Sequence, residues 1–269
     1  MIIREPTFKP EPTTYIGKLG RYILNMTAEV GRASAICIGA FVGMRGLVNR
    51  RERKEVISQI YSCAIKSLPV VTLVAFFIGM ILALQLGIEL RRFNQENLIG
   101  SAVMASVLRE MGPFMSGLVL AACVGAAMAA QIGTMMVNEE IAALEIMSID
   151  PLRFLVMPRM VAMMFTVPML SFYTCVLALV GGAVVGFTQL SVPFTVYWQN
   201  AFDFATLRPF LVGMFKALLF GIIIVTVACY EGFSTSHGAV GVGKATRRCV
   251  VTCFLLILIV GYFVTRLFY

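Results

Sequence analysis

Long apolar stretches, interrupted by short polar segments, fill the chain from about residue 68 to its end. An α-helix needs roughly 20 mainly apolar residues to cross the hydrocarbon core of a bilayer. Five stretches fit such spans, namely 68–90, 98–137, 154–187, 209–230 and 249–264. The composition agrees, because 59% of the residues are hydrophobic, against roughly 45–50% in soluble domains. The pattern therefore predicts an all-α polytopic membrane protein with five transmembrane helices.

The basic residues predict how these spans are oriented. Eleven Lys or Arg residues fall within residues 1–66, and five more lie in the segments 138–160 and 231–248. The segments on the other side contain only Arg91, Arg92, Arg208 and Arg266. Because cytosolic segments are enriched in Lys and Arg, we expect a cytosolic N-terminus and a C-terminus on the outer side. No cleavable signal peptide is expected, since its characteristic pattern is missing from the first forty residues.

The N-terminal region, residues 1–60, differs from the rest. After a tail that ends near residue 14, the segment 15–48 mixes apolar residues with charges that recur too often for a span. This mixture predicts one or two amphipathic helices lying in the membrane interface, and a soluble cytosolic helix is the alternative. The net charge of +8 comes mostly from residues that flank spans, for which anionic lipid headgroups are nearer partners than nucleic acid.

The second stretch, 98–137, is about twice as long as a span requires, so its helix must tilt, kink or project. Gly112 and Pro113 predict a kink, because proline has no backbone N–H to donate and clashes with the preceding turn. A run rich in Gly and Ala follows, from Gly117 to Gly133, and other helices can approach such a face closely. The spacing alone does not separate packing within the chain from a dimer contact.

A short cytosolic helix is predicted between the second and third spans, at about 138–150, before Asp150 and Pro151 begin the next helix. Asn138 would cap this helix, and Glu139 and Glu140 would lie at the positive end of its dipole. An apolar side, with Glu145 among its members, would be formed by Ile141, Leu144, Met147 and Ile149. Such a helix either seats a membrane subunit in a groove of a soluble motor protein or is an ordinary connection.

Three types of chemical site are not supported. The segment GAVGVGK at 238–244 begins like a phosphate-binding loop, but Ala245 replaces the Ser or Thr that binds magnesium. A flexible glycine turn is expected there instead. His237 is the only histidine, so neither a histidine-based catalytic triad nor a multi-histidine metal site can be assembled. The seven cysteines form no CxxC pair, and we expect them to be small core residues without metal or disulfides.

Glu110 is the best candidate for an ionisable group at membrane depth. Arg109 precedes it, but adjacent residues on a helix do not face each other. Lys216 in the fourth span is a candidate partner, although lysines near a span commonly extend to the interface instead. Because such groups are costly in a bilayer unless paired or hydrated, they indicate a transport or coupling function.

A second polar feature lies near the outer end of the first span. Gln85 and Glu89 are one helical turn apart, among the apolar residues Leu82, Leu86, Leu90 and Phe93. A wall of this mixed character suits an amphiphile with an acyl tail and a polar head. For Glu89, solvation of the helix end is an equal explanation.

Five motifs then occur in order: IGMILALQ at 78–85, LREMGP at 108–113, the small-residue stretch through GTM at 133–135, EEIAALEIMSIDPLRFLVMPR at 139–159, and GAVGVGKATRRCVV at 238–251. By these motifs the chain resembles the MlaE/YrbE-type permeases, the membrane subunits of bacterial ABC lipid-transport systems that work with MCE proteins. The resemblance extends from about residue 60 to the end of the chain.

The chain departs from this family at two positions. Family members commonly carry an Arg and a Glu where this chain has Cys123 and Gln131. We expect that losing both opposite charges together leaves neither of them buried and unpaired. A role of that charge pair is therefore not carried over.

The resemblance implies a five-span permease domain over residues 61–269, which acts as a homodimer around a lipid cavity in the bacterial inner membrane. A separate cytosolic ABC ATPase would dock on the short helix, and an MCE-domain protein would receive or supply phospholipid on the outer face. A small regulatory subunit is a further candidate partner, and the chain itself would need no cofactor and catalyse nothing. The residues expected in the lipid cavity are Leu82, Gln85, Glu89, Leu90, Phe93 and Glu110. Those expected to couple to the ATPase are Glu139, Glu140, Glu145 and Asp150.

Two other classes of function are the alternatives. A stand-alone ion- or proton-coupled transporter would use Glu110 and Lys216 and would respond to pH and membrane potential without an ATPase. Five spans without an inverted repeat make that architecture less natural. A purely structural membrane anchor would tolerate Glu110→Ala and Leu82→Trp without any change in lipid handling.

Overall fold

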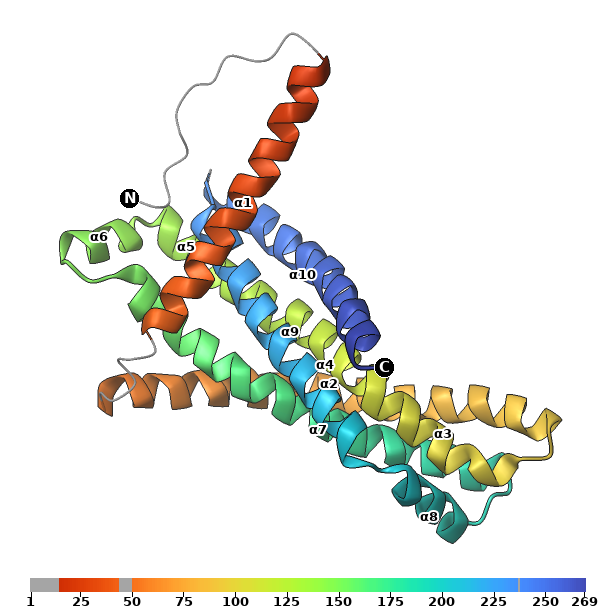
Figure 1. The fold of residues 1–269 in the computed structure, drawn as a ribbon. Helices are drawn as coiled ribbons and strands as arrows, with labels where there is room; N and C mark the ends of the chain where they lie inside the picture. The colour runs from red at the N-terminus through yellow and green to blue at the C-terminus, as the bar shows by residue number, and fades with distance from the viewer. Residues whose placement is uncertain (1–14, 44–49, 237) are drawn as a thin grey trace.

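The computed structural model describes residues 15–43, 50–236 and 238–269, which form helices joined by short connections (Figure 1). The helices are α1 (Tyr15–Gly43), α2 (Arg50–Arg92), α3 (Ile99–Ser106), α4 (Gly112–Leu120), α5 (Ala126–Val137), α6 (Glu140–Ile146), α7 (Met157–Thr188), α8 (Phe194–Phe204), α9 (Leu207–Phe233) and α10 (Gly238–Phe268). In the described part of the chain, five segments are long and apolar enough to cross a membrane: Arg53–Arg92, Glu96–Val137, Leu152–Thr188, Leu207–Phe233 and Gly238–Phe268. The prediction of an all-α protein with five spans is confirmed.

The second span is one helical path in which α3, α4 and α5 follow one another across the molecule (Figure 1). Two π-helical turns, Val107–Met111 and Ala121–Gly125, separate these three helices. The first of them ends directly before Gly112 and Pro113, where the kink was predicted. Single π-helical turns are frequent at functional sites, and this one contains both Arg109 and Glu110.

Glycines allow the longest helices to lie very close together. A Cβ atom added at Gly79 of α2 would collide with the backbone of Ala178 in α7, and one added at Gly181 of α7 would collide with the backbone of Phe76 in α2. Small residues are favoured at such contacts, because apolar lipid supplies no hydrophobic driving force and helices associate through close packing. The contact between α2 and α7 therefore depends on Gly at these positions.

The small-residue face of the second span packs largely within the chain. A Cβ atom at Gly117, Gly125 or Gly133 would lie 3.1, 3.0 or 2.8 Å from a side-chain atom of Phe220, Ile224 or Thr235, respectively. All three neighbours come from α9 or the turn that follows it. Of the two explanations for this face, close packing inside the chain accounts for these three positions.

The short helix α6 is narrower than predicted and begins differently. It covers Glu140–Ile146, and Glu139 occupies the N-cap position in a left-handed conformation with φ 59°. Asn138 instead ends α5, and its side-chain amide donates to the Glu140 carboxylate over 3.2 Å. The prediction that Asn138 caps this helix is therefore wrong, because α5 continues to Val137 and the chain reverses at Glu139.

The predicted flexible glycine turn at 238–244 is also wrong. Only Gly238 has a positive φ, 66°, and the residues after it form the first turns of α10. A Cβ atom at Gly241 would collide with the backbone oxygen of Ser236. Helical geometry at a close contact therefore explains this glycine. His237 lies outside the described residues.

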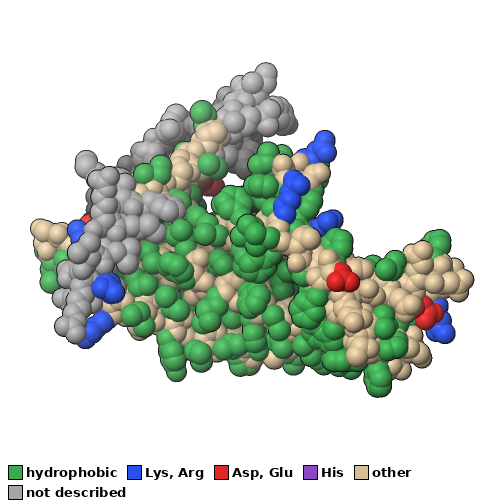
Figure 2. Space-filling model, turned by 60° about the horizontal axis from the view of Figure 1, so that its bottom comes forward, with side chains coloured by type: hydrophobic (Ala, Val, Ile, Leu, Met, Phe, Trp, Pro, Cys, Tyr) green, Lys and Arg blue, Asp and Glu red, His purple; other side chains and the backbone are tan. Residues whose placement is uncertain are grey.

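The surface has the distribution of side chains expected for a membrane protein. Figure 2 shows a broad face of hydrophobic side chains, with Lys, Arg, Asp and Glu towards its edges. The seven cysteines are free, and five of them are buried: Cys63, Cys175, Cys229, Cys249 and Cys253. Cys37 is partly buried and Cys123 is exposed, so the expectation of buried cysteines holds for most of them.

Candidate functional site

Glu110, Lys216 and Thr265 form a polar cluster inside the helical bundle. The Lys216 Nζ atom lies 2.7 Å from Glu110 Oε1 and donates to the Arg109 carbonyl oxygen over 2.9 Å and to Thr265 Oγ1 over 2.6 Å. The Thr265 hydroxyl is also 2.6 Å from Glu110 Oε1. The cluster therefore joins the π-helical turn of the second span to α9 and α10, and the predicted pairing of Glu110 with Lys216 is confirmed.

The two partners of this ion pair have very different environments. The Lys216 side chain is 1% exposed, whereas that of Glu110 is 41% exposed. Burial of an ammonium group is costly unless a charge and hydrogen bonds compensate it. Here Glu110 supplies the charge and is itself partly exposed, so this carboxylate is the part of the cluster that reaches the surface of the chain.

Arg109 extends the cluster on another side. Its guanidinium carbon lies 5.4 Å from the ring centre of Phe204 and 4.8 Å from that of Tyr269. Both distances fall within the roughly 6 Å range of cation–π attraction. Arg109 thus carries a positive charge between α8 and the end of α10, and its buried Nε atom has no hydrogen-bond partner among the described residues.

The predicted lipid-cavity residues of α2 lie along one stripe of the helix. Leu82, Leu86 and Leu90 are partly buried and pack against buried core residues of α3, α7 and α8. Gln85 is exposed, and Phe93 is 72% exposed. Their assignment to a lipid cavity stays a prediction, and two cavities of the described chain, of about 440 and 660 Å³, do not include them.

Glu89 forms an exposed ion pair at the end of α2. Its Oε2 atom lies 3.3 Å from Nη1 of Arg92, and both side chains are exposed. Exposed pairs of this kind contribute little to stability. Glu89 thus has a partner at the end of the helix, and contact with lipid and solvation of the helix end both stay explanations for its position.

The four predicted coupling residues, Glu139, Glu140, Glu145 and Asp150, are all exposed around α6. Ile141 is buried beneath the helix, whereas Ile146 is 85% exposed and Met147 67% exposed. The residues predicted for the apolar side of this helix thus differ in burial, since Ile141 is buried and Met147 is exposed. The result is an exposed end of α6 with both apolar and acidic side chains, separated from the cluster of Glu110.

Gln131 has a partner that the sequence did not suggest. Its Oε1 atom accepts a hydrogen bond from Nη2 of Arg159 over 3.3 Å. Arg159 is 7% exposed and, in the described part of the chain, its Nη1 atom has no hydrogen-bond partner. The expectation about positions 123 and 131 concerned only the two replaced charges, and Arg159 is a third charge that it did not consider.

Two functional candidates were missed at the sequence level. Thr265 sits near the end of α10, and nothing in its local sequence connects it with Glu110, which is 155 positions earlier. Arg159 ends the MPR motif and looked like a cytosolic flanking residue. Only the packing of α5 and α7 places it inside the protein.

Five spanning segments around a buried ion pair define a multi-pass membrane protein. The family model described as Permease MlaE matches residues 56–267. The chain therefore belongs to the MlaE permease family, as its motifs indicated.

Three relatives cover most of the chain. A probable ABC transporter permease protein of Rickettsia typhi is 40% identical over 252 residues, which are 93% of this chain and 96% of that protein. The intermembrane phospholipid transport system permease protein MlaE of Haemophilus influenzae is 30% identical over 258 residues, 95% and 97% of the two chains. A probable ABC transporter permease protein of a Synechocystis species is 32% identical over 226 residues, 84% and 85% of the two chains.

Proposed function

We propose that this chain is the membrane permease subunit of an ABC-type system that moves phospholipid across the space outside the inner membrane. The observation that carries the proposal is membership of the MlaE permease family over residues 56–267. The name of the Haemophilus relative adds phospholipid transport, and the names of the Rickettsia and Synechocystis relatives add the ABC class. The chain has a transport role in this proposal, and a separate subunit hydrolyses ATP.

The substrate cavity in this proposal lies where α2 presents its mixed stripe and where Glu110 opens to the surface. Leu82, Leu90 and Phe93 would contact acyl chains, while Gln85, Glu89 and Glu110 would face the polar headgroup. A second copy of the chain would close the cavity, because a stripe on one exposed helix cannot enclose a lipid by itself. The partner on the outer face would be an MCE-domain protein that receives or supplies the lipid.

The ATPase would dock on the exposed surface of α6, with the N-terminus of the chain on the same, cytosolic side. Ile146 and Met147 offer apolar contact area there, and Glu139, Glu140, Glu145 and Asp150 offer charges for basic residues of a partner. Such rim charges mainly set specificity and association rate. Closure of two ATPase copies on ATP would move α6 and, through it, α5 and α7.

In this proposal, the movement of the helices changes the surroundings of the Glu110–Lys216 pair. A conformational change shifts only when a ligand binds its two states with different affinity. In this proposal the lipid headgroup meets Glu110 in one state only, so that lipid and nucleotide each favour a different arrangement of the second span. The π-helical turn at Val107–Met111 is where that span would adjust.

Charge reversal at α6 tests the docking. In the double variant Glu139→Lys/Glu145→Lys we expect normal membrane insertion and loss of ATPase co-purification. The matched control is Glu89→Lys/Glu96→Lys, which reverses one exposed and one partly buried acid at the other end of the molecule. Full co-purification of the ATPase with the α6 variant would contradict the docking surface.

The ion pair also favours a second candidate, a stand-alone ion- or proton-coupled transporter, because buried charge pairs in spans often serve such transport. Transport that follows pH and membrane potential in vesicles containing only this chain would support that alternative. Transport that requires ATP and a second subunit would support the lipid permease.

A further inference from the structure

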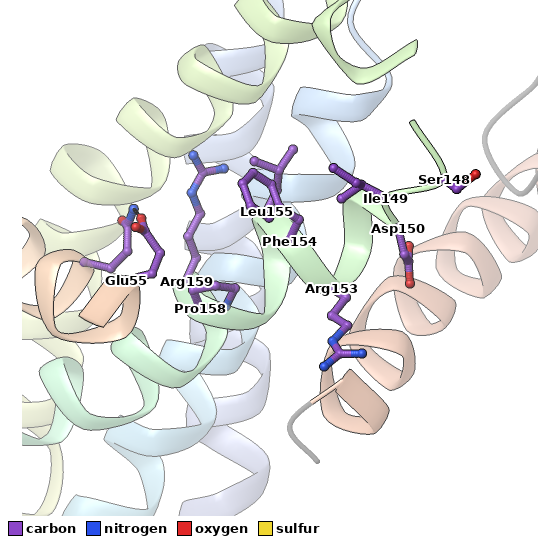
Figure 3. A pocket seen from close by; sticks show the side chains of 10 residues that line it. Glu55, Ser148, Ile149, Asp150, Arg153, Phe154, Leu155, Pro158 and Arg159 are labelled. Carbon is purple, nitrogen blue, oxygen red and sulfur yellow. Dashed lines mark hydrogen bonds between the residues drawn. The ribbon is translucent and has the colours of Figure 1, made fainter. Parts of the chain in front are cut away.

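A cavity of about 660 Å³ lies at the end of the molecule that contains α6, between the beginning of α2 and the beginning of α7 (Figure 3). Glu55 of α2 forms part of its wall, and Asp150, Arg153, Phe154, Leu155 and Arg159 form much of the rest. Volumes of a few hundred Å³ up to about 1,000 Å³ are typical of small-molecule sites. The cavity is distinct from the stripe on α2 that is proposed to meet transported lipid.

Arg159 is the reason to expect an anion here. The side chain is 7% exposed, its Nη2 atom donates to the neutral amide of Gln131 over 3.3 Å, and its Nη1 atom meets no acceptor in the described part of the chain. Across the described residues, no carboxylate lies within ion-pair distance of it, including Glu55 of the same cavity. A buried cation that keeps only a neutral partner is costly, so an acceptor supplied by a ligand would compensate it.

The other side chains narrow the chemistry of that ligand. Arg153 lines the cavity as a second cation, whereas Glu55 and Asp150 add two carboxylates at the wall. A guanidinium group binds phosphate with two parallel hydrogen bonds. The carboxylates would repel a purely anionic phosphate, but they would favour an ammonium group attached to it. Phe154 and Leu155 add apolar surface beside these charges.

We propose that this cavity binds a phosphate–ammonium zwitterion, with the phosphate at Arg159 and the amine at Glu55 or Asp150. Two sources share this chemistry: the headgroup of an aminophospholipid in the cytosolic leaflet, and a soluble phosphoethanolamine. Basic pockets on the cytosolic side of membrane proteins are known to bind the phosphate groups of lipid headgroups. The site goes beyond the proposed transport function, because its ligand stays at the end of the molecule near α6 and touches none of the residues assigned to the transported lipid.

The test measures lipid binding to the purified full chain by native mass spectrometry. The probe is phosphatidylethanolamine in detergent, with phosphatidylglycerol of the same acyl chains as the comparison lipid. In the variant Gln131→Glu a carboxylate replaces the amide 3.3 Å from Arg159, so it would pair with the guanidinium and exclude the phosphate. We expect about tenfold weaker binding of phosphatidylethanolamine, as for loss of one charge-assisted hydrogen bond.

Two further variants keep this test decisive. Gln199→Glu makes the same chemical change on the exposed side of α8, outside both proposed lipid sites, and should leave the binding of phosphatidylethanolamine unchanged. Arg159→Gln removes the cation itself and should weaken binding as strongly as Gln131→Glu does. Unchanged phosphatidylethanolamine binding in both Gln131→Glu and Arg159→Gln would overturn the site, and equal binding of phosphatidylglycerol by the unchanged chain would overturn the zwitterion.

Competition identifies the source of the ligand. Displacement of bound phosphatidylethanolamine by soluble phosphoethanolamine supports the soluble zwitterion, and retention of the lipid supports the membrane headgroup. Loss of lipid binding in Gln85→Glu alone, a change in the proposed transport cavity, would instead assign all binding to that cavity and overturn the separate site. A failure of this proposal therefore differs in outcome from a failure of the transport proposal.

Discussion

Replacing Glu110 with Gln removes the carboxylate that neutralises Lys216 while nearly preserving the size of the side chain. The Lys216 ammonium would keep its bonds to the Arg109 carbonyl and to Thr265, but it would stay almost fully buried without a counter-charge. Removing one partner of a buried ion pair costs roughly 3–5 kcal/mol. Because the Glu110 side chain is 41% exposed, water screens part of the pair, and we expect a loss of about 2 kcal/mol in the free energy of unfolding.

The measurement is reversible unfolding of the purified chain in mixed micelles with increasing denaturing detergent. The double variant Glu110→Gln/Lys216→Met should be more stable than Glu110→Gln alone, since it removes the orphaned cation as well. Glu89→Gln is the matched control, because it also breaks a Glu ion pair, yet the pair with Arg92 is exposed and should contribute less than about 1 kcal/mol. Equal stability of Glu110→Gln and Glu89→Gln would refute the reasoning.

Three further predictions concern helix packing, the short helix α8 and the lipid stripe on α2. Gly79→Leu should prevent stable folding, because its side chain would enter the backbone of Ala178; the monodisperse fraction in size-exclusion chromatography measures this, with Gly243→Leu, which has open space, as the control. Tyr197→Phe should lose about 1 kcal/mol, since the hydroxyl donates to the Leu179 carbonyl over 3.2 Å. Burial raises the pKa of the Tyr197 phenol. The stabilising contribution of this group is therefore complete below its ordinary pKa near 10, and it is lost as the pH rises through the higher pKa of the folded state. The midpoint temperature of thermal unfolding should consequently fall less steeply with rising pH in Tyr197→Phe than in the unchanged chain. Leu82→Trp should slow lipid transfer several-fold in reconstituted vesicles without loss of protein, and unchanged transfer would favour a structural anchor.

The sequence predicted the spans better than it predicted the helices. Hydropathy detects the part of a helix that lies in lipid, so it located 68–90 but not the first 18 residues of α2, which begins at Arg50. Those residues are charged or polar at many positions and still continue the helix. In the same way, the apolar and acidic pattern at 138–150 predicted a short helix, but the left-handed turn at Glu139 set where it begins.

The polar sites divide along the same line. The pairing of Glu110 with Lys216 was predictable, because two charges in apolar spans need compensation and few partners were available. Thr265 and the Arg159–Gln131 contact were not predictable, because each depends on how separate helices approach one another. The local sequence indicates that a polar residue in a span needs a compensating partner, whereas only the packing of the helices determines which residue that partner is.

The central claim is tested most directly by purifying the tagged chain from its native membrane in a mild detergent and identifying the proteins and lipids that accompany it. The account predicts an ABC ATPase, an MCE-domain protein and bound phospholipid. A chain that arrives alone and without lipid would contradict the lipid-permease function, and it would make ion-coupled transport through Glu110 the next hypothesis to test.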